Sequence, residues 1–226
     1  MNSITKKHCP PWLSDIRKTN PERTYGSLST VQRKKLRAAL IEEQGYVCCF
    51  CGDALGMIDG RLGVDQGPVT GLNHNIRIAH LKPQSAAPDL TLDYDNMCAS
   101  CESGGGKNGR GVKGEKHCDL RQGDRFLPVE PTQEDCLSYF AFGTDGSIYP
   151  NPNKSESEQE KARETIEILG LNSEDLRQKR VAVVKHVHQC LLKDRSFLNR
   201  IAARNELGCH MPFYFAALSY YGRSRT

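Results

Sequence analysis

The sequence contains no run of about 18 apolar residues, the length that a helix needs to cross a bilayer. No apolar segment follows its first residues, Met1–Lys7, so a secretory leader is not expected. It also has no phosphate-binding P-loop, because Gly106 and Lys107 are followed by Asn108 and the first glycine of that motif is missing. We therefore expect a cytoplasmic protein with no membrane partner.

The excess of one sign of charge is also small: the 226 residues carry a formal net charge of only +4. This charge is unevenly distributed, with +5 on residues 1–47, −5 on residues 48–150 and +4 on residues 151–226. An acidic centre between basic flanks suits a cation-using site held against a polyanion, although ordinary solvated faces explain imbalances of this size equally well. The length allows one sizeable core, or a small catalytic domain plus a second unit.

Cysteine, in contrast, is abundant, with ten residues. In a reducing compartment, cysteines act as metal ligands or as small buried side chains rather than as disulfides. Two CxxC pairs have the number and spacing of ligands in a closed zinc site. We therefore predict a structural Zn²⁺ held by Cys48, Cys51, Cys98 and Cys101, with Cys118 as the substitute ligand and the other five cysteines as packed thiols.

Local patterns predict the main elements. A capping box at Ser29–Gln32 indicates a helix that ends at Gly45, and the alternation of Ile76, Ile78 and His80 indicates a strand. The remaining expectations are a hairpin from 137–142 and 147–149, a capping box at 157–160 with a helix to Gly170, a helix from an Asn172 cap to about Lys193, and shorter helices over 197–207 and 212–221. We attribute the aromatic end, 211–221, to core packing ahead of a partner-binding patch.

The segment 103–116 has too many glycines for a regular helix or strand and is rich in basic residues. We expect it to form a flexible basic loop that attracts phosphate. The predicted nucleic-acid-binding residues are Lys107, Arg110, Lys113 and Lys116 of this loop, together with Lys82.

Three polar residues suggest hydrolytic chemistry. His80 ends the predicted strand, where a neutral imidazole could accept a proton from water, and a packed histidine is the alternative. Asn96 precedes the second CxxC pair, where its amide could hold a facing loop or cap a helix. His117 with Asp119 offers nitrogen and oxygen ligands for a divalent cation, and a surface histidine is an equal alternative.

The order His80, Asn96, His117 around a zinc-stapled frame resembles the HNH endonuclease superfamily. The segments 36–52, 78–84 and 94–97 with His117 and Cys118 are similar, more narrowly, to the PtuB family, the HNH effectors of Septu and retron anti-phage defence. This resemblance implies an α+β fold with a zinc-stapled ββα-metal core, an N-terminal helix and a C-terminal helical region.

The implied organisation is an arm and helix over 1–47, the nuclease core over 48–126, and a hairpin with a partner-binding helical region over 127–226. The implied activity is Mg²⁺- or Mn²⁺-dependent cleavage of DNA, with His80 as base, Asn96 as the loop-ordering residue and His117 as metal ligand. The implied partners are a PtuA-like ABC/SMC-type ATPase and, in a retron, the reverse transcriptase and its DNA product.

One departure from the superfamily concerns the metal. A metal-binding Asp, Glu or His commonly precedes the base histidine, and here that position is Ala79. Asn commonly follows the second CxxC pair, and here Glu102 does. The cation is then expected to be held by His117 with Glu102, Asp119 or another acidic residue, or to be held weakly. The competing hypotheses are a non-catalytic zinc module that binds nucleic acid and a pure interaction subunit of the same complex.

Overall fold

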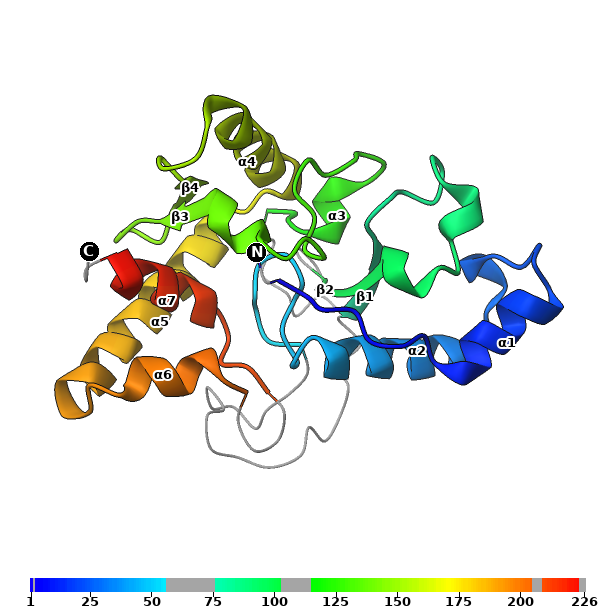
Figure 1. Ribbon diagram of the computed structural model, residues 1–226, viewed down its shortest axis with the longest axis horizontal. Helices are drawn as coiled ribbons and strands as arrows, with labels where there is room; N and C mark the ends of the chain where they lie inside the picture. The colour runs from blue at the N-terminus through cyan, green and yellow to red at the C-terminus, as the bar shows by residue number, and fades with distance from the viewer. Residues whose placement is uncertain (2, 56–75, 103–114, 205–208, 224–226) are drawn as a thin grey trace.

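The computed structural model describes residues 1, 3–55, 76–102, 115–204 and 209–223. In chain order its elements are α1 (Pro11–Thr19), α2 (Thr30–Glu43), β1 (Ile76–His80), β2 (Met97–Cys101), α3 (Asp119–Gln122), β3 (Phe140–Phe142), β4 (Ile148–Pro150), α4 (Glu156–Leu169), α5 (Glu174–Lys193), α6 (Phe197–Ala202) and α7 (Tyr214–Arg223). The fold is α+β, as predicted. In Figure 1, α1 and α2 lie on one side of the molecule, β1 and β2 at the centre, and α4–α7 on the other side.

Helix α2 begins where the sequence predicts. The Ser29 hydroxyl accepts a hydrogen bond from the Gln32 amide N–H at 3.2 Å, and the Gln32 side chain accepts one from the Ser29 N–H at 2.8 Å. After the helix, Gly45 adopts a φ of +66°, a conformation that costs glycine little and directs the chain toward Cys48. Helix α2 packs against both β1 and β2.

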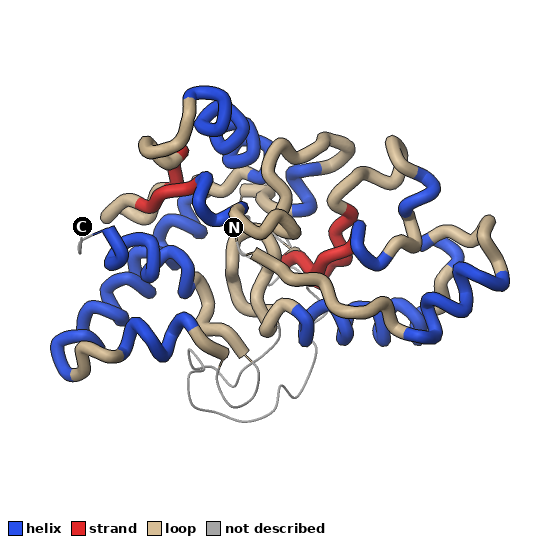
Figure 2. The backbone as a smooth tube through the Cα atoms, in the orientation of Figure 1, coloured by secondary structure: helices blue, strands red, loops and turns tan. Residues whose placement is uncertain are grey.

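Strands β1 and β2 form an antiparallel pair at the centre of the molecule, drawn in red in Figure 2. Ile76 pairs with Cys101 and His80 with Met97, so His80 and Asn96 lie at the same end of the pair. The predicted strand over 76–80 is confirmed. The short helix α3 packs against β1.

The second sheet is the predicted hairpin, β3 paired with β4. Helix α4 begins two residues earlier than predicted, because Ser155 rather than Ser157 forms the capping box with Glu158. Gly170 ends this helix in the left-handed conformation, as expected. Asn172 does not cap α5: its side-chain amide instead makes two 2.8 Å hydrogen bonds to the backbone of Ile148, and Ser173 occupies the cap position.

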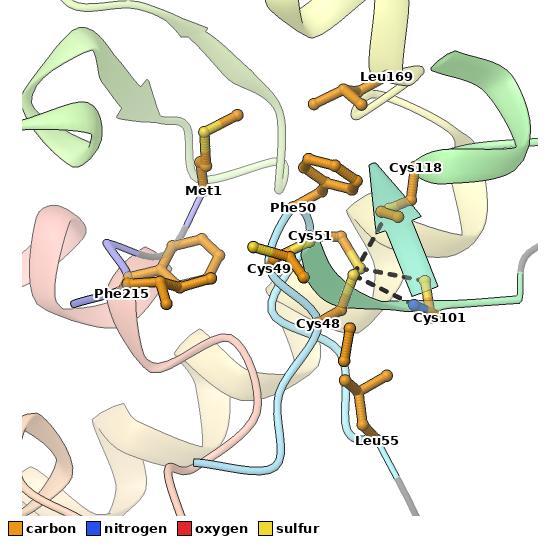
Figure 3. Packing of buried hydrophobic residues seen from close by; sticks show 14 of the residues in the cluster. Met1, Cys48, Cys49, Phe50, Cys51, Leu55, Cys101, Cys118, Leu169 and Phe215 are labelled. Carbon is orange, nitrogen blue, oxygen red and sulfur yellow. Dashed lines mark hydrogen bonds between the residues drawn. The ribbon is translucent and has the colours of Figure 1, made fainter. Parts of the chain in front are cut away.

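The C-terminal segment packs onto the turn that contains the first CxxC pair. The Phe213 N–H donates to the Gly52 carbonyl at 2.9 Å, and the His210 N–H donates to the Gly45 carbonyl at 2.8 Å. Phe215 is 1% exposed, and Figure 3 shows its ring on the side of the first pair that Cys49 faces. The aromatic end of the described chain is therefore largely core, as predicted.

The N-terminal arm contacts α2 and the start of β2. The Lys6 ammonium forms an ion pair with Glu43 at 2.5 Å, donates to the Met97 carbonyl at 2.9 Å and lies 4.0 Å from the centroid of the Tyr94 ring. Helix α1 follows this arm and was not predicted, since Leu13 is its one fully buried residue. None of the described helices is long and apolar enough to cross a membrane.

Candidate functional site

Four buried cysteine sulfurs meet between the first CxxC turn, the end of β2 and the start of α3. The sulfurs of Cys48, Cys51, Cys101 and Cys118 lie within 4.8 Å of one another. The Cys48–Cys118 sulfur separation is 3.9 Å and the Cys51–Cys101 separation is 3.6 Å. Figure 3 shows these four side chains converging from three segments of the chain.

This set differs from the predicted one, because Cys118 replaces Cys98. Cys98 and Cys101 both lie in β2, where side chains alternate between faces, so residues three apart point in opposite directions. Cys48 and Cys51, in contrast, lie in a turn that brings both thiols to one side. Cys98 is buried beside Cys49 on the opposite face of β2, and the assignment of Cys98 as a zinc ligand is wrong.

The geometry of this four-cysteine cluster fits Zn²⁺. A tetrahedral site with Zn–S bonds of about 2.3 Å has sulfur–sulfur separations of about 3.8 Å, close to the two distances above. Although burial opposes ionisation, hydrogen bonds from neighbouring thiols, Cys101 and Cys118 first among them, lower the pKa of Cys48 well below its ordinary value. Burial raises the pKa of Cys118, and a bound cation would offset that cost.

Cys118 is held in place by the backbone. Its φ is +56°, a conformation that L-residues other than Asn and Asp seldom adopt. Its N–H donates to the Leu169 carbonyl at 2.8 Å, at the end of α4. The cluster therefore ties α3 and α4 to the central strands.

A buried arginine supplies positive charge beside the cluster. Arg180 of α5 is 1% exposed and donates to the Gly146 carbonyl at 2.8 Å and the Leu171 carbonyl at 2.5 Å. Burial lowers its pKa to about 10, while Cys51 and Cys118 act in the opposite direction. Four thiolates around Zn²⁺ carry a net charge of −2, so a buried guanidinium is well matched to this site.

His80 lies at the end of β1 and is 7% exposed. Its Nε2 atom is 3.0 Å from the Thr91 carbonyl, which can only accept a hydrogen bond. Nε2 therefore carries the proton, and Nδ1 is the ring atom with a free lone pair. Burial lowers the pKa of His80, which favours the neutral imidazole, while the Thr91 hydrogen bond and the Asp119 charge act in the opposite direction.

Asn96 holds the loop that follows His80. Its side-chain oxygen accepts from the Lys82 N–H at 2.8 Å, and its amide nitrogen donates to the carbonyls of Lys82 at 3.1 Å and Leu90 at 3.2 Å. The amide thus joins Lys82, just after β1, to Leu90, further along the connection to β2, which is the loop contact that the sequence predicts for this residue. Asn96 is buried.

The three predicted divalent-cation ligands are not brought together. His117 is buried, with its Nδ1 atom 3.2 Å from the Cys118 sulfur, so it faces the cysteine cluster. Burial lowers its pKa. Asp119 instead pairs with Arg77 at 2.5 Å, and Glu102 is half-buried after β2. Among the described residues, the four cysteines are the one group of three or more metal-ligating side chains.

Two of the predicted nucleic-acid-binding residues, Lys82 and Lys116, are exposed. The other three, Lys107, Arg110 and Lys113, lie outside the described residues. Three residues near the site carried no sequence signal of their own: Tyr25 and Arg180 through their side chains and Thr91 through its backbone carbonyl.

No protein-family model matches the chain. It is 30% identical over 151 residues to a protein of Vibrio cholerae serotype O1 biovar El Tor named "Retron Vc95 putative HNH endonuclease". The aligned stretch covers 66% of this chain and 62% of that protein, so the chain spans less than two thirds of the relative's length. The similarity supports a relationship to HNH endonucleases of retrons.

Proposed function

We propose that this protein is a metal-dependent HNH endonuclease that hydrolyses phosphodiester bonds in DNA. The observation that carries the proposal is His80, whose Nε2 proton is directed to the Thr91 carbonyl so that Nδ1 is left as a base. The relative's name is consistent with this activity.

In this proposal, Nδ1 of His80 takes a proton from a water molecule as the water oxygen attacks phosphorus and the leaving oxygen departs. The imidazole must be neutral for this step, and burial, which lowers its pKa, favours the neutral form. The Thr91 carbonyl stabilises the protonated ring that forms, because it continues to accept from Nε2. Asn96 keeps the loop after His80 in place during the reaction.

Mg²⁺ or Mn²⁺ would neutralise the charge that develops on the phosphate. The described residues do not gather a ligand set for such an ion, since His117 faces the cysteines and Asp119 pairs with Arg77. We therefore assign no ligands to it. Zn²⁺, in contrast, would be held by the four-cysteine cluster, where it stabilises the fold.

We further propose that the nuclease is the cytoplasmic effector of an anti-phage complex with a PtuA-like ABC/SMC-type ATPase. The reverse transcriptase of a retron and its DNA product are additional proposed partners. The retron in the relative's name and the motifs shared with the PtuB family support this context.

The proposal is tested by cleavage of plasmid DNA with Mg²⁺, with Mn²⁺ and with EDTA. We expect His80→Ala to lower the cation-dependent rate by about 100- to 10,000-fold, the usual effect of losing a general base. His188→Ala is the matched control, because His188 is an exposed histidine on α5, a helix that Figure 1 shows apart from β1. Equal rates for wild type and His80→Ala would contradict the catalytic role.

A second candidate is a non-catalytic zinc module that binds nucleic acid. Ala79 in place of an acidic ligand and the separation of His117 from Asp119 favour it. This candidate predicts salt-dependent DNA binding that is unchanged in His80→Ala, with no cleavage by either protein when the ATPase is also present.

A further inference from the structure

One side of the His80 ring is closed by a residue from the N-terminal part of the chain. The rings of Tyr25 and His80 meet edge to face, with centroids 5.2 Å apart and an interplanar angle of 76°. Tyr25 begins a 3₁₀ turn, Tyr25–Ser27, that precedes α2. His80 is therefore held by Thr91 through a hydrogen bond and by Tyr25 through ring packing.

An arginine lies over the ring of Tyr25. The Arg33 guanidinium carbon is 5.1 Å from the ring centroid, and an Arg33 nitrogen donates to the Gly26 carbonyl at 2.6 Å. The capping box at Ser29 fixes the start of α2 and hence the position of Arg33 in its first turn. Arg33, Tyr25 and His80 thus form a continuous row of three contacting side chains.

The charge of Arg33 is not balanced by a carboxylate. No ion pair of Arg33 occurs among the residues that the structure describes, whereas Arg77, the basic residue of β1, is paired with Asp119. The Nε atom of Arg33 is buried without a hydrogen-bond partner. Because no described carboxylate pairs with it, the Arg33 guanidinium can bind an anion, and it suits phosphate oxygens because its donors form a planar fork.

We infer that Tyr25 and Arg33 belong to the substrate-binding side of the His80 site. In this inference, which rests on the proposed function, Arg33 binds a backbone phosphate of the nucleic acid and Tyr25 positions the His80 ring. Packing on Tyr25 restricts the Arg33 side chain before substrate binds, which lowers the entropic cost of the contact. The Tyr25 ring excludes water from one edge of His80.

Arg33 is tested by binding and cleavage of a fluorescein-labelled DNA duplex. We expect Arg33→Gln to weaken binding or to lower kcat by about tenfold or more, the usual effect of losing a charge-assisted contact, and Arg33→Lys to recover part of the loss. Lys34→Gln is the matched control, because it removes the same charge from the next position of α2, where the side chain is exposed. Equal effects of Arg33→Gln and Lys34→Gln would overturn the assignment of Arg33.

Tyr25 is tested by the titration of the His80 imidazole, followed by NMR without substrate. Burial lowers the pKa of His80, while the Thr91 carbonyl and the Asp119 carboxylate act against it, and the guanidinium groups of Arg33 and Arg77 lie near Tyr25. Tyr25→Ala admits water and should raise the pKa of His80, and Tyr25→Phe should leave it unchanged. The acid limb of the pH–rate profile should move to higher pH in Tyr25→Ala alone.

The outcomes separate this inference from the proposed function. If wild type cleaves DNA and the Tyr25→Ala titration matches that of wild type, the role of Tyr25 is refuted while the nuclease proposal stands. If wild type cuts nothing, the nuclease proposal fails, and the NMR titration and the duplex binding still decide the roles of Tyr25 and Arg33. Thermal melting of each variant checks that the fold is retained.

Discussion

At the scale of single residues, the direction in which the backbone sends a side chain decides which cysteines meet. Cys98 has the CxxC spacing but lies in β2, whereas Cys118 has no such partner yet enters the cluster through a left-handed backbone conformation. A CxxC pair gathers both thiols only where the chain turns between them, as it does from Cys48 to Cys51. The four-cysteine cluster thus combines one CxxC pair with two cysteines that are distant from it in sequence.

Substitution of Cys98 or of Cys118 by serine tests which of the two belongs to the cluster. We expect Cys118→Ser to lose the metal and unfold the centre of the molecule, because binding of structural zinc supplies folding free energy. Cys98→Ser should keep about one Zn²⁺ per chain and lose only about 1–3 kcal/mol, the cost of a buried hydroxyl without a partner. Metal content and urea denaturation measure both effects, and metal loss in Cys98→Ser would contradict the observed cluster.

At the scale of elements, the contact between the first CxxC turn and the segment before α7 depends on the absence of a side chain at Gly52. Gly52 has a φ of +79°, and a Cβ atom placed there would lie 2.2 Å from the ring of Phe215. The backbone hydrogen bond from Phe213 to Gly52 runs through the same contact. The α7 segment therefore helps to hold the turn that carries Cys48 and Cys51.

Gly52→Ala should be more destabilising than an alanine at another left-handed glycine. Gly123 is the matched control, because its φ is +57° and no atom lies within 4 Å of a Cβ built there. We expect Gly123→Ala to cost about 1–2 kcal/mol for the backbone conformation alone. Overlap with Phe215 should add about 1–3 kcal/mol in Gly52→Ala. Urea denaturation of the two zinc-loaded variants is the measurement, and equal losses would show that the Phe215 contact is unimportant.

At the scale of the whole molecule, the two ends of the described chain close around the same centre. Lys6 is bonded to Glu43 and Met97, while Arg204 donates to the carbonyls of Glu42 and Glu43 from the opposite end. Removal of residues 196–226 would therefore expose core surface around the first CxxC turn. The proposed role of the C-terminal helices in partner binding is better tested by substitution of exposed residues of α5, such as Leu192, which is 76% exposed.

The packing of the C-terminal end against the centre of the molecule should become less stable in acid because of His210. Its ring stacks on Tyr214 with centroids 4.5 Å apart, and burial, followed by the charge of Arg204, lowers its pKa to about 4. An unfolded histidine has a pKa of about 6.5, so the unfolded state binds the proton first. The stability that His210 contributes is complete above pH 6.5 and is lost as the pH falls toward 4.

The measurement is urea denaturation of wild type and His210→Gln between pH 7.5 and pH 4.5. Wild type should lose more free energy of unfolding over this range than the variant, which cannot take up the proton. Identical pH dependence in the two proteins would mean that His210 is not buried in its neutral form.

The sequence alone determined the elements whose signals are local. The capping box at Ser29, the strand Ile76–His80, the hairpin around Gly143–Gly146 and the stop at Gly170 depend on residues only a few positions apart, and these predictions are confirmed. The capping box placed at Ser157 instead of Ser155 shows the limit, since both serines have an acidic residue three positions on.

Only the tertiary structure decided which distant side chains meet. The replacement of Cys98 by Cys118, the approach of His117 to the cysteines, the pairing of Asp119 with Arg77 and the packing of Tyr25 on His80 join residues from separate segments. Spacing along the chain cannot specify these contacts, because they depend on strand register, backbone conformation and helix packing. The composition of the four-cysteine cluster and the surroundings of His80 therefore follow from the folded chain.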